Sequence, residues 1–237
     1  MKFDNKTVFV TGANRGIGKA IVDALLKQQV KKVYAAARKV QDIKFNDPRV
    51  VPVSLDITDL AQINKAVAQA GDTQVLINNA GVLSIASVVT GDPKVLMSDM
   101  QVNYIGTLSM VSAFVPILEK NGGGTIANIS SIVGLAPMAG IGGYSASKAA
   151  LHSATQAMRI ELKAKNISVH GVYPGPIDTD MAKDFDMPKT SAAETASNIL
   201  AGIIADKEDI FPDGMSMQLG EVYAKDPKAL EIQFASM

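Results

Sequence analysis

The sequence predicts an α/β protein with a doubly wound, seven-stranded and mainly parallel sheet that carries helices on both faces. Short apolar runs rich in Val, Ile and Ala alternate with longer segments of helical period, as in βαβ units whose strands are buried on both faces. A glycine-rich turn joins the first apolar run to the first helical segment. Because no internal repeat or low-complexity linker divides the 237 residues, we expect a single domain over 1–237.

Seven apolar runs have the length and composition of strands. In chain order they are Thr7–Thr11, Lys32–Ala37, Val50–Ser54, Gln74–Asn78, Thr125–Ile129, Ile167–Val172 and the weaker Asp209–Phe211. Longer segments with helical patterns separate most of these runs, as expected of strands that pair in parallel.

The first helical segment has the clearest amphipathic pattern. Its apolar residues Ile17, Ala20, Ile21, Ala24 and Leu25 recur at the spacing of one helix face, so we expect this face to pack on the sheet. Further helices are predicted over Leu60–Ala70, near Met100–Leu118, near Tyr144–Lys165, over Ala192–Ile204 and from Pro227 onward.

The composition excludes several classes of function. Lys and Arg total 23, as do Asp and Glu, so no net charge attracts nucleic acid or an anionic membrane surface. The absence of cysteine excludes thiolate nucleophiles, iron–sulfur clusters and cysteine-ligated zinc. No run of about 18 apolar residues lacks a charge or a Gly/Pro break, so we expect no membrane span. The start of the chain lacks a signal-peptide pattern, and we expect a cytoplasmic protein.

The glycine-rich turn has the sequence TGANRGIG over residues 11–18. Glycines permit a tight turn and the close approach of a pyrophosphate, and a helix N-terminus offers this anion free N–H groups and a favourable dipole. The alternative is a plain turn. The strand before it and the helix after it favour a dinucleotide site.

Together with this turn, the segment YSASK at residues 144–148 resembles the short-chain dehydrogenase/reductase family. The resemblance extends to NNAG at 78–81, NYIG at 103–106 and PGPIDT at 174–179, and it covers about Lys6 to Met181. It implies a Rossmann-like fold of the one-domain branch, in which a nicotinamide cofactor exchanges hydride with a carbonyl or alcohol.

Tyr144 and Lys148 are four residues apart, so on a helix they project from the same face. A phenol titrates near pH 10, and a nearby ammonium lowers that pKa toward the range useful for acid–base catalysis. The alternative is a surface Tyr beside a solvated Lys. The resemblance makes both residues catalytic.

Ser130 and Ser131 close the fifth predicted strand, and one of them should face the ligand. The resemblance selects Ser131. Asn103 lies inside an apolar helix, where a buried amide requires a partner. The resemblance makes Asn103 catalytic through a water linked to Lys148, and the alternative is an amide bonded only to main chain.

The residues after the second strand indicate which nicotinamide cofactor is used. An NAD enzyme usually has a carboxylate there for the ribose 2′-hydroxyl, whereas arginine accommodates a 2′-phosphate. This chain has Ala37 and Arg38 at that point, Asp42 comes too late, and Arg15 can supply a second guanidinium. We therefore predict NADP, with NADPH preferred over NADH. The alternative for Arg38 is a solvated surface charge.

The remaining site residues follow from the turn, the resemblance and the apolar character of nearby segments. The predicted cofactor-binding residues are Gly12, Asn14, Arg15, Gly16, Ile17, Gly18, Arg38, Asp56, Ile57, Asn79, Ala80, Gly81, Tyr144, Lys148, Pro174, Gly175, Ile177 and Thr179. The predicted substrate-binding residues are Ser131, Val133, Met138, Tyr144, Met181 and Phe185, with Ala136 and Met187 as further candidates. Asp56 has a helix cap as its alternative role. A substrate lid is expected near 178–195 and a divergent tail over 205–237.

No metal site is predicted. The acidic residues between Asp178 and Asp186 lack the glycine and distal glutamate of a calcium loop. His152 and His170 have no further ligand at a metal-binding spacing.

These observations predict an NADPH-dependent ketone or aldehyde reductase that acts on a small-molecule carbonyl or secondary alcohol. A 3-oxoacyl thioester reductase is the alternative within this class, and a catalytically silent nucleotide sensor is the alternative outside it. The long helices resemble those of the family's dimer interface, so we expect a homodimer or homotetramer. The stretch Ile210–Met215 departs from the family's usual last strand.

Overall fold

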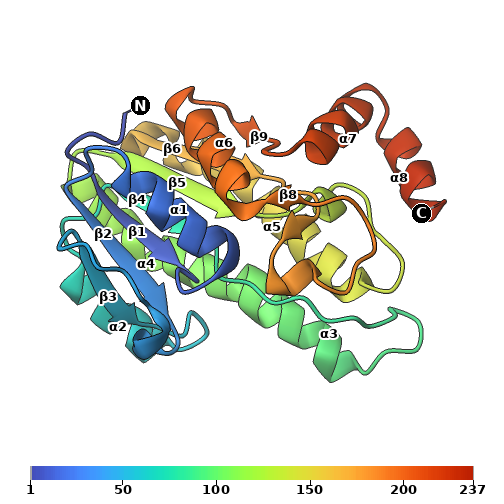
Figure 1. Cartoon of the computed structure of the whole chain (residues 1–237), viewed down its shortest axis with the longest axis horizontal. Coiled ribbons are helices and arrows are strands. Elements are labelled where there is room, and N and C mark those ends of the chain that lie inside the picture. Colours follow the sequence, from blue (N-terminus) through green and yellow to red (C-terminus); the bar gives the residue numbers. More distant parts are fainter. Residues whose placement is uncertain (1, 237) are drawn as a thin grey trace.

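The computed structural model describes residues 2–236 and contains a parallel sheet with the order β3-β2-β1-β4-β5-β6-β9 (Figure 1). Its strands are β1 (Thr7–Thr11), β2 (Lys32–Ala37), β3 (Val50–Ser54), β4 (Val75–Asn78), β5 (Gly124–Ile129), β6 (Ile167–Val172) and β9 (Asp209–Ile210). All six pairings are parallel, from β2 beside β3 to β6 beside β9. The predicted Rossmann-like α/β fold is confirmed, and the sheet is parallel throughout.

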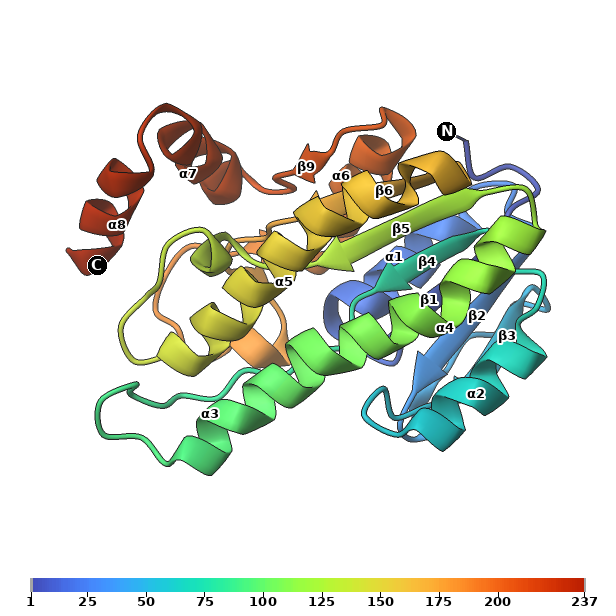
Figure 2. The ribbon, with the colours of Figure 1, turned by 180° about the vertical axis from the view of Figure 1, so that it is seen from behind.

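Helices cover both faces of the sheet. On one face, α1 (Gly16–Leu26) packs against α6 (Ala192–Ile204). On the other face lie α2 (Leu60–Gln69), α4 (Thr107–Lys120) and α5 (Gly142–Leu162), which Figure 2 shows from behind. Each face buries its own apolar cluster, because side chains alternate between the faces along every strand.

The strand order reverses at β1, which pairs with β2 on one side and β4 on the other. At such a switch point the loops after neighbouring strands diverge and leave a crevice beyond their carboxyl ends. Thr11, Asn78 and Ile129 end β1, β4 and β5 at this edge. The motifs that directly follow these strands therefore meet there.

One continuous helical segment is longer than predicted. It begins with α3 (Pro93–Asp99), passes through a π-helical stretch η2 (Met100–Gly106) and continues as α4. Asp92 caps its start by accepting a hydrogen bond from the N–H of Lys94, and Pro93 occupies the first turn. These are ordinary start signals, and the sequence prediction missed them by placing the start near Met100.

This segment, Pro93–Lys120, is also long and apolar enough to cross a membrane by length and composition, with a mean hydropathy of 1.3. The sequence analysis expected no span because no such run lacks a charge or a Gly/Pro break, and Asp99, Gly106 and Pro116 do interrupt this segment. In the fold, Met110, Phe114 and Leu118 are buried in the cluster under the sheet. This packing is that of a helix that belongs to a protein core.

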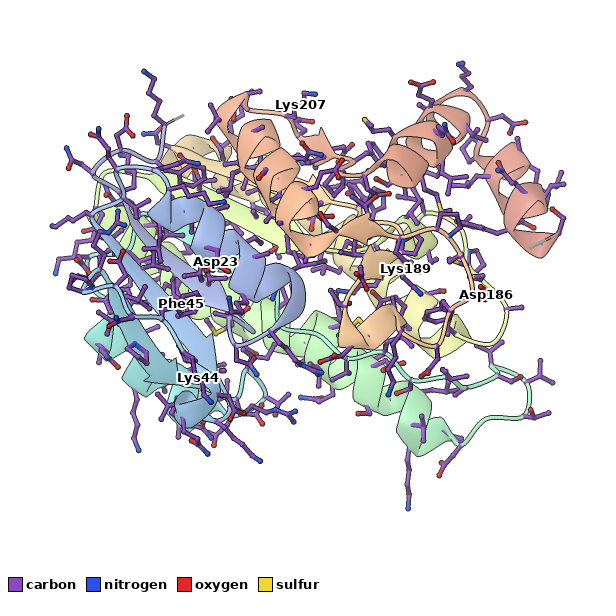
Figure 3. The ribbon with its side chains drawn as sticks, viewed as in Figure 1. Asp23, Lys44, Phe45, Asp186, Lys189 and Lys207 are labelled. Atoms are coloured by element: carbon purple, nitrogen blue, oxygen red, sulfur yellow. The ribbon has the colours of Figure 1, made fainter. Side chains whose placement is uncertain are left out.

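The predicted substrate lid and the predicted C-terminal tail both contain regular secondary structure. The predicted lid contains η5 (Asp180–Ala182) and a small ladder of β7 (Ile177–Asp178) beside β8 (Thr190–Ser191). Figure 3 labels Asp186 and Lys189 in this segment. The predicted tail forms two helices, α7 (Gly214–Lys225) and α8 (Pro227–Ala235). Only the second was predicted. Short 3₁₀ turns lie at η1 (Val40–Asp42), η3 (Ile132–Gly134) and η4 (Lys163–Lys165).

Candidate active site

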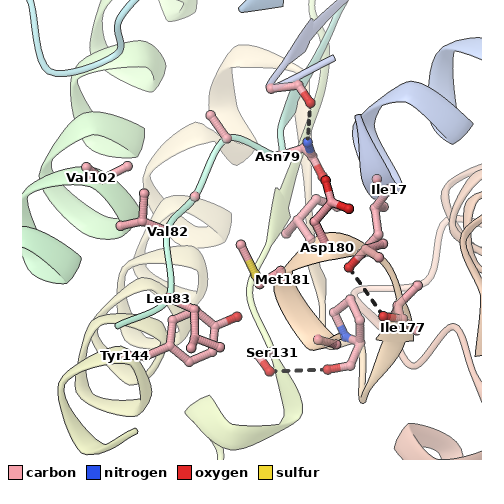
Figure 4. Close-up of a pocket in the computed structure, with 18 of the residues that line it drawn as sticks. Ile17, Asn79, Val82, Leu83, Val102, Ser131, Tyr144, Ile177, Asp180 and Met181 are labelled. Atoms are coloured by element: carbon pink, nitrogen blue, oxygen red, sulfur yellow. Dashed lines mark hydrogen bonds between the residues drawn. The ribbon is translucent and has the colours of Figure 1, made fainter. Parts of the chain in front are cut away.

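A cavity of about 1040 Å³ lies at the carboxyl ends of the strands. Its wall includes Thr11 at the end of β1, Asn79 after β4, Ser130 after β5 and Pro174 after β6. Figure 4 shows Ser131 and Tyr144 beside one another at one end, and Asn79 near Ile17 at another. The two halves of the predicted site therefore share one cavity.

The glycine turn lines one end of this cavity. Gly12 and Gly16 have φ angles of +64° and +53°, which favour glycine. A Cβ on Gly12 would lie 2.9 Å from the Cα of Ala80, so a side chain there would also clash with the loop after β4. Helix α1 begins here without a side-chain cap and without an acidic residue in its first turn. Its free N–H groups and positive dipole end suit an anion.

The turn is held by the NNAG segment. The hydroxyl of Thr11 accepts hydrogen bonds from the N–H groups of Asn79 and Ala80 at 2.9 and 3.0 Å. In return, the Asn79 amide donates to the carbonyl oxygens of Thr11 and Gly12 at 2.9 and 3.1 Å. Asn79 thus fixes the two loops relative to one another. Gly18 packs beneath the turn against Gly12 and Asn79 and is not on the cavity wall, in contrast to its predicted contact role.

Three cationic side chains lie where the sequence places the 2′-phosphate. Arg15, Arg38 and Lys39 all line the cavity, and all three residues are exposed. Asp42 also lines the cavity, although it lies five residues beyond the end of β2. The turn η1 brings Asp42 back toward the end of β2. The alternation of apolar and polar residues that predicts strands does not predict such a turn.

Arg15 forms an ion pair with Asp180 of the predicted lid at 3.3 Å. Both side chains are largely exposed, so the pair adds little to stability. It nevertheless connects the glycine turn to the lid. Thr179, directly before it, lies over Gly16, where a Cβ would approach the Thr179 methyl group to 3.3 Å.

Asp56 lies on the cavity wall beside Ile57. Its carboxylate accepts hydrogen bonds from the N–H and the hydroxyl of Thr58 at 2.9 and 2.7 Å. The cap of α2 is Asp59, not Asp56, so the helix-cap alternative for Asp56 is wrong. Asp56 instead closes a short turn that shapes this part of the wall.

Ser131, Tyr144 and Lys148 are brought together and buried, with exposed fractions of 8%, 8% and 4%. Lys148 Nζ lies 5.6 Å from the centre of the Tyr144 ring and donates to the carbonyl oxygen of Ile129 at 2.7 Å. The Ser131 hydroxyl donates to the carbonyl oxygen of Pro174 at 3.2 Å. All three side chains therefore belong to one water-poor end of the cavity.

Burial governs the titration of this group. It raises the pKa of Tyr144 to about 12, while the Ser131 hydroxyl acts to lower that pKa and the charge of Asp99 raises it further. Burial also lowers the pKa of Lys148 to about 8, against the attraction of Asp99. Desolvation dominates the Tyr144 pKa in this apolar setting, and the predicted lowering of that pKa by Lys148 is not supported.

Ser130 and Asn103 form hydrogen bonds with the part of α5 that carries Tyr144 and Lys148. The Ser130 hydroxyl donates to the carbonyl oxygen of Lys148 at 3.0 Å. The Asn103 amide exchanges hydrogen bonds with the main chain of Val82 at 2.8 and 2.9 Å and donates to the Ser147 hydroxyl at 2.9 Å. Asn103 is fully buried and is not on the cavity wall. The main-chain alternative describes most of its contacts, and Ser147 is the addition.

Asp99 is a buried carboxyl that the sequence analysis did not single out. It lies one helical turn before Asn103 and has no exposed surface. One oxygen accepts a hydrogen bond from the Ser84 hydroxyl at 3.0 Å, and the other has no hydrogen-bond partner among the described residues. Burial raises the pKa of Asp99, against the Ser84 hydrogen bonds and the charge of Lys148.

The predicted substrate residues Val133, Met138, Met181 and Phe185 line the cavity, as does Met187. Ala136 is buried in the neighbouring apolar cluster and lies off the wall. The sequence analysis also missed several apolar residues of the wall, four of which matter below. These are Leu83, Ile141, Met215 and Phe234.

Within residues 2–236, no group of three or more His, Asp or Glu side chains is placed to hold a metal ion. His152 bonds the Tyr173 hydroxyl through Nδ1 at 2.7 Å, and His170 bonds the carbonyl oxygen of Lys207 at 2.7 Å. Both histidines therefore have structural partners.

The sequence matches the family model of the short chain dehydrogenases over residues 6–189. The chain therefore belongs to this family of NAD(P)-dependent oxidoreductases, as the resemblance predicted.

Individual relatives agree with this assignment. An uncharacterized oxidoreductase of Staphylococcus saprophyticus is 32% identical over 200 residues, which cover 78% of this chain and 84% of that protein. A 3-oxoacyl-[acyl-carrier-protein] reductase of Thermotoga maritima is 30% identical over 220 residues, or 89% of each chain. A short chain dehydrogenase of Burkholderia cenocepacia, crystallised with NADP, is 37% identical with a TM-score of 0.94 over 99% of both chains.

Proposed function

We propose that this protein is an NADPH-dependent reductase that transfers a hydride between a nicotinamide cofactor and a ketone, aldehyde or secondary alcohol. The observation that carries the proposal is the meeting of Ser131, Tyr144 and Lys148 with the glycine turn in one cavity. A proton donor, a buried cation and an anion-binding helix terminus are the parts that carbonyl reduction requires.

The residues present fit a phosphorylated dinucleotide. The uncapped N-terminus of α1 and the side-chain-free surface at Gly12 and Gly16 suit a pyrophosphate. Arg15 and Arg38 would hold the 2′-phosphate, with Lys39 adding charge. We assign Asp56 and Ile57 to the adenine. The NADP bound by the relative from Burkholderia cenocepacia supports this choice of cofactor.

Further along the cofactor, we assign contacts to the remaining predicted residues that line the cavity. These are Asn14, Ile17, Asn79, Ala80, Gly81, Tyr144, Lys148, Pro174, Gly175, Ile177 and Thr179. Lys148 would contact the ribose and Thr179 the carboxamide. Gly18 is not assigned a cofactor contact, because it packs against Gly12 and Asn79 beneath the turn.

When bound, the reduced cofactor supplies the hydride. Ser131 donates a hydrogen bond to the substrate carbonyl oxygen and orients it. Tyr144 gives its phenolic proton to that oxygen as negative charge develops on it. The raised pKa of Tyr144 keeps this proton in place at neutral pH. The positive charge of Lys148 then stabilises the phenolate.

Asn103 acts through its neighbours in this scheme. Its amide holds Ser147, whose hydroxyl donates to the carbonyl oxygen of Tyr144 at 2.7 Å. Asn103 therefore positions the turn of α5 that carries the proton donor.

Two alternatives to this proposed function can be tested by experiment. The similarity of this chain to the 3-oxoacyl-[acyl-carrier-protein] reductase from Thermotoga maritima supports a 3-oxoacyl thioester as the alternative substrate. A nucleotide sensor without catalysis is the other alternative, and the burial of Ser131, Tyr144 and Lys148 together argues against it.

The test is NADPH consumption with a panel of apolar ketones and aldehydes and with acetoacetyl-coenzyme A. Turnover of the apolar carbonyls with a higher kcat/KM than the thioester supports the proposal. A higher kcat/KM for the thioester supports the first alternative. Cofactor binding without turnover of any carbonyl identifies a sensor.

We further propose one domain over 1–237, a cytoplasmic location and a homodimer or homotetramer. The apolar side chains of Val95, Met97 and Ile105 on the long helical segment and Ile160 on α5 are exposed, which supports an interface along these helices. Light scattering at micromolar concentration tests the assembly, and a monomer there contradicts it.

A further inference from the structure

The C-terminal helices reach into the cavity. Phe234 of α8 and Met215 of α7 are both on its wall. Phe234 is buried in an apolar cluster that also contains Leu230, Val133 and Tyr144. The last helix of the fold therefore belongs to the same apolar cluster as the proton donor, although 90 positions separate Tyr144 from Phe234 in the sequence.

Specific contacts fix this segment in place. The carboxylate of Asp213 binds the N–H of Gly175 in the loop after β6, and Asp213 itself is 1% exposed. Phe211 stacks on Tyr173 with ring centres 5.4 Å apart. A Cβ on Gly220 of α7 would lie 2.7 Å from the Phe211 ring, so helix and ring are in close contact. The position of α7 is set by the same loop that lines the cavity.

The wall around Tyr144 is apolar, whereas the charged wall residues gather elsewhere. Leu83, Ile141, Phe185, Met215 and Phe234 surround the substrate end. The acidic and basic wall residues other than Lys148 belong to the glycine turn, the loops after β2 and β3, and the lid. A charged substrate group at the apolar end would lose its hydration without gaining a partner.

We propose that Phe234, together with Met215, forms the wall that limits substrate size, so that the protein acts on compact, uncharged and apolar carbonyl compounds. This inference rests on the proposed function and narrows its substrate class. A thioester with a long polar arm fits such a wall poorly, because the arm must leave the cavity past apolar side chains.

The experiment compares Phe234→Ala with the matched control Ile232→Ala, which truncates an exposed side chain of the same helix. The substrates are cyclopentanone, acetophenone and 2-acetylnaphthalene, with NADPH as reductant. In Phe234→Ala, the ratio of kcat/KM for 2-acetylnaphthalene to that for cyclopentanone should rise about tenfold or more. Differences in how well a substrate fills an apolar pocket change kcat/KM by factors of this size. The KM for NADPH should stay within about twofold in both variants.

If the ratio of kcat/KM values in Phe234→Ala equals that of the wild type and of Ile232→Ala, Phe234 does not limit substrate size. The proposed function is unaffected by that result. If the wild type reduces neither these ketones nor any carbonyl of the panel described above, the proposed function fails. The wall is then tested by isothermal titration calorimetry of the three corresponding alcohols into NADP⁺-loaded protein. A shift of binding preference toward the largest alcohol in Phe234→Ala supports the wall, and an unchanged preference overturns it.

Discussion

The carboxylate of Asp213 accepts a hydrogen bond from the main-chain N–H of Gly175 at 2.8 Å. The same carboxylate accepts a second bond from the N–H of Ser216 at 2.8 Å, and the Ser216 hydroxyl accepts one from the N–H of Asp213 at 3.2 Å. Asp213 is therefore both the N-cap of α7 and the partner of a loop on the cavity wall. One buried side chain couples the C-terminal helices to the candidate cofactor site.

Asp213→Ala should lower the free energy of unfolding by about 2 kcal/mol or more, because a helix cap is lost and the N–H of Gly175 is left unpaired. Urea denaturation measures this. The matched control is Asp226→Ala, which removes the exposed cap of α8 and should cost about 1 kcal/mol. Equal losses in the two variants would contradict the coupling of Asp213 to Gly175.

Tyr144→Phe should fold and bind NADPH like the wild type and lose nearly all turnover, since only the transferable proton is removed. Lys148→Ala should also weaken cofactor binding, because Lys148 is assigned to the ribose as well. Fluorescence titration of NADPH and steady-state kinetics distinguish the two variants. Near-normal activity of Tyr144→Phe would sink the assignment of the proton donor.

Asp99 predicts a pH dependence of stability. Burial raises its pKa in the folded state above the ordinary aspartate value of 3.8. Such a group stabilises the fold below its unfolded pKa, and this contribution is lost as the pH rises through the folded pKa. Asp99→Asn, which cannot ionise, should therefore gain free energy of unfolding relative to the wild type as the pH rises above the unfolded aspartate pKa of 3.8.

Urea denaturation over a series of pH values checks the Asp99 prediction. Asp186→Asn is the control, since it makes the same change of charge at an exposed position. A difference between Asp99→Asn and wild type that does not vary with pH would refute the ionisation of Asp99 as the cause.

NADPH should be preferred over NADH. Charge-assisted hydrogen bonds from a guanidinium contribute roughly 1.5–3 kcal/mol each, so Arg38→Ala should weaken NADPH about ten- to hundredfold and leave NADH nearly unaffected. Ala37→Asp with Arg38→Ala should invert the preference by adding an acceptor for the ribose hydroxyl. Asp42→Asn should favour NADPH slightly, because it removes a negative charge from the same wall.

The measurement is kcat/KM for both reduced cofactors at one substrate concentration and moderate salt, because salt screens the phosphate attraction. Equal or better use of NADH by the wild type would make Arg38 a solvated surface residue.

Most of the sheet and the centre of the site follow from local sequence patterns. The bounds of β1, β2, β3, β6 and α6 agree with the predicted ones, because Val- and Ile-rich runs and an apolar helix stripe are local properties. The glycine turn and the Tyr144–Lys148 spacing are likewise contained in a few consecutive residues. Such features need no knowledge of the rest of the fold.

The missed parts depend on contacts between distant segments. Helix α7 has no clear apolar stripe, and its start is set by the Asp213–Ser216 capping pair and its packing by Phe211. Phe234 belongs to no motif and reaches the cavity only because α8 folds back on the loop after β5. Asp42 returns through the turn η1. Long-range packing of this kind leaves little trace in a single sequence.

The wall of the cavity also sets an order of events during synthesis. Ribosomes make the chain from its N-terminus, so the glycine turn and Tyr144 leave the ribosome well before Phe234. Until α8 docks, the apolar surface beside Tyr144 faces water or a chaperone. Contacts between residues so far apart in sequence form slowly. We therefore expect the binding chamber to be completed late in folding, after the recognisable motifs of the chain have been synthesised.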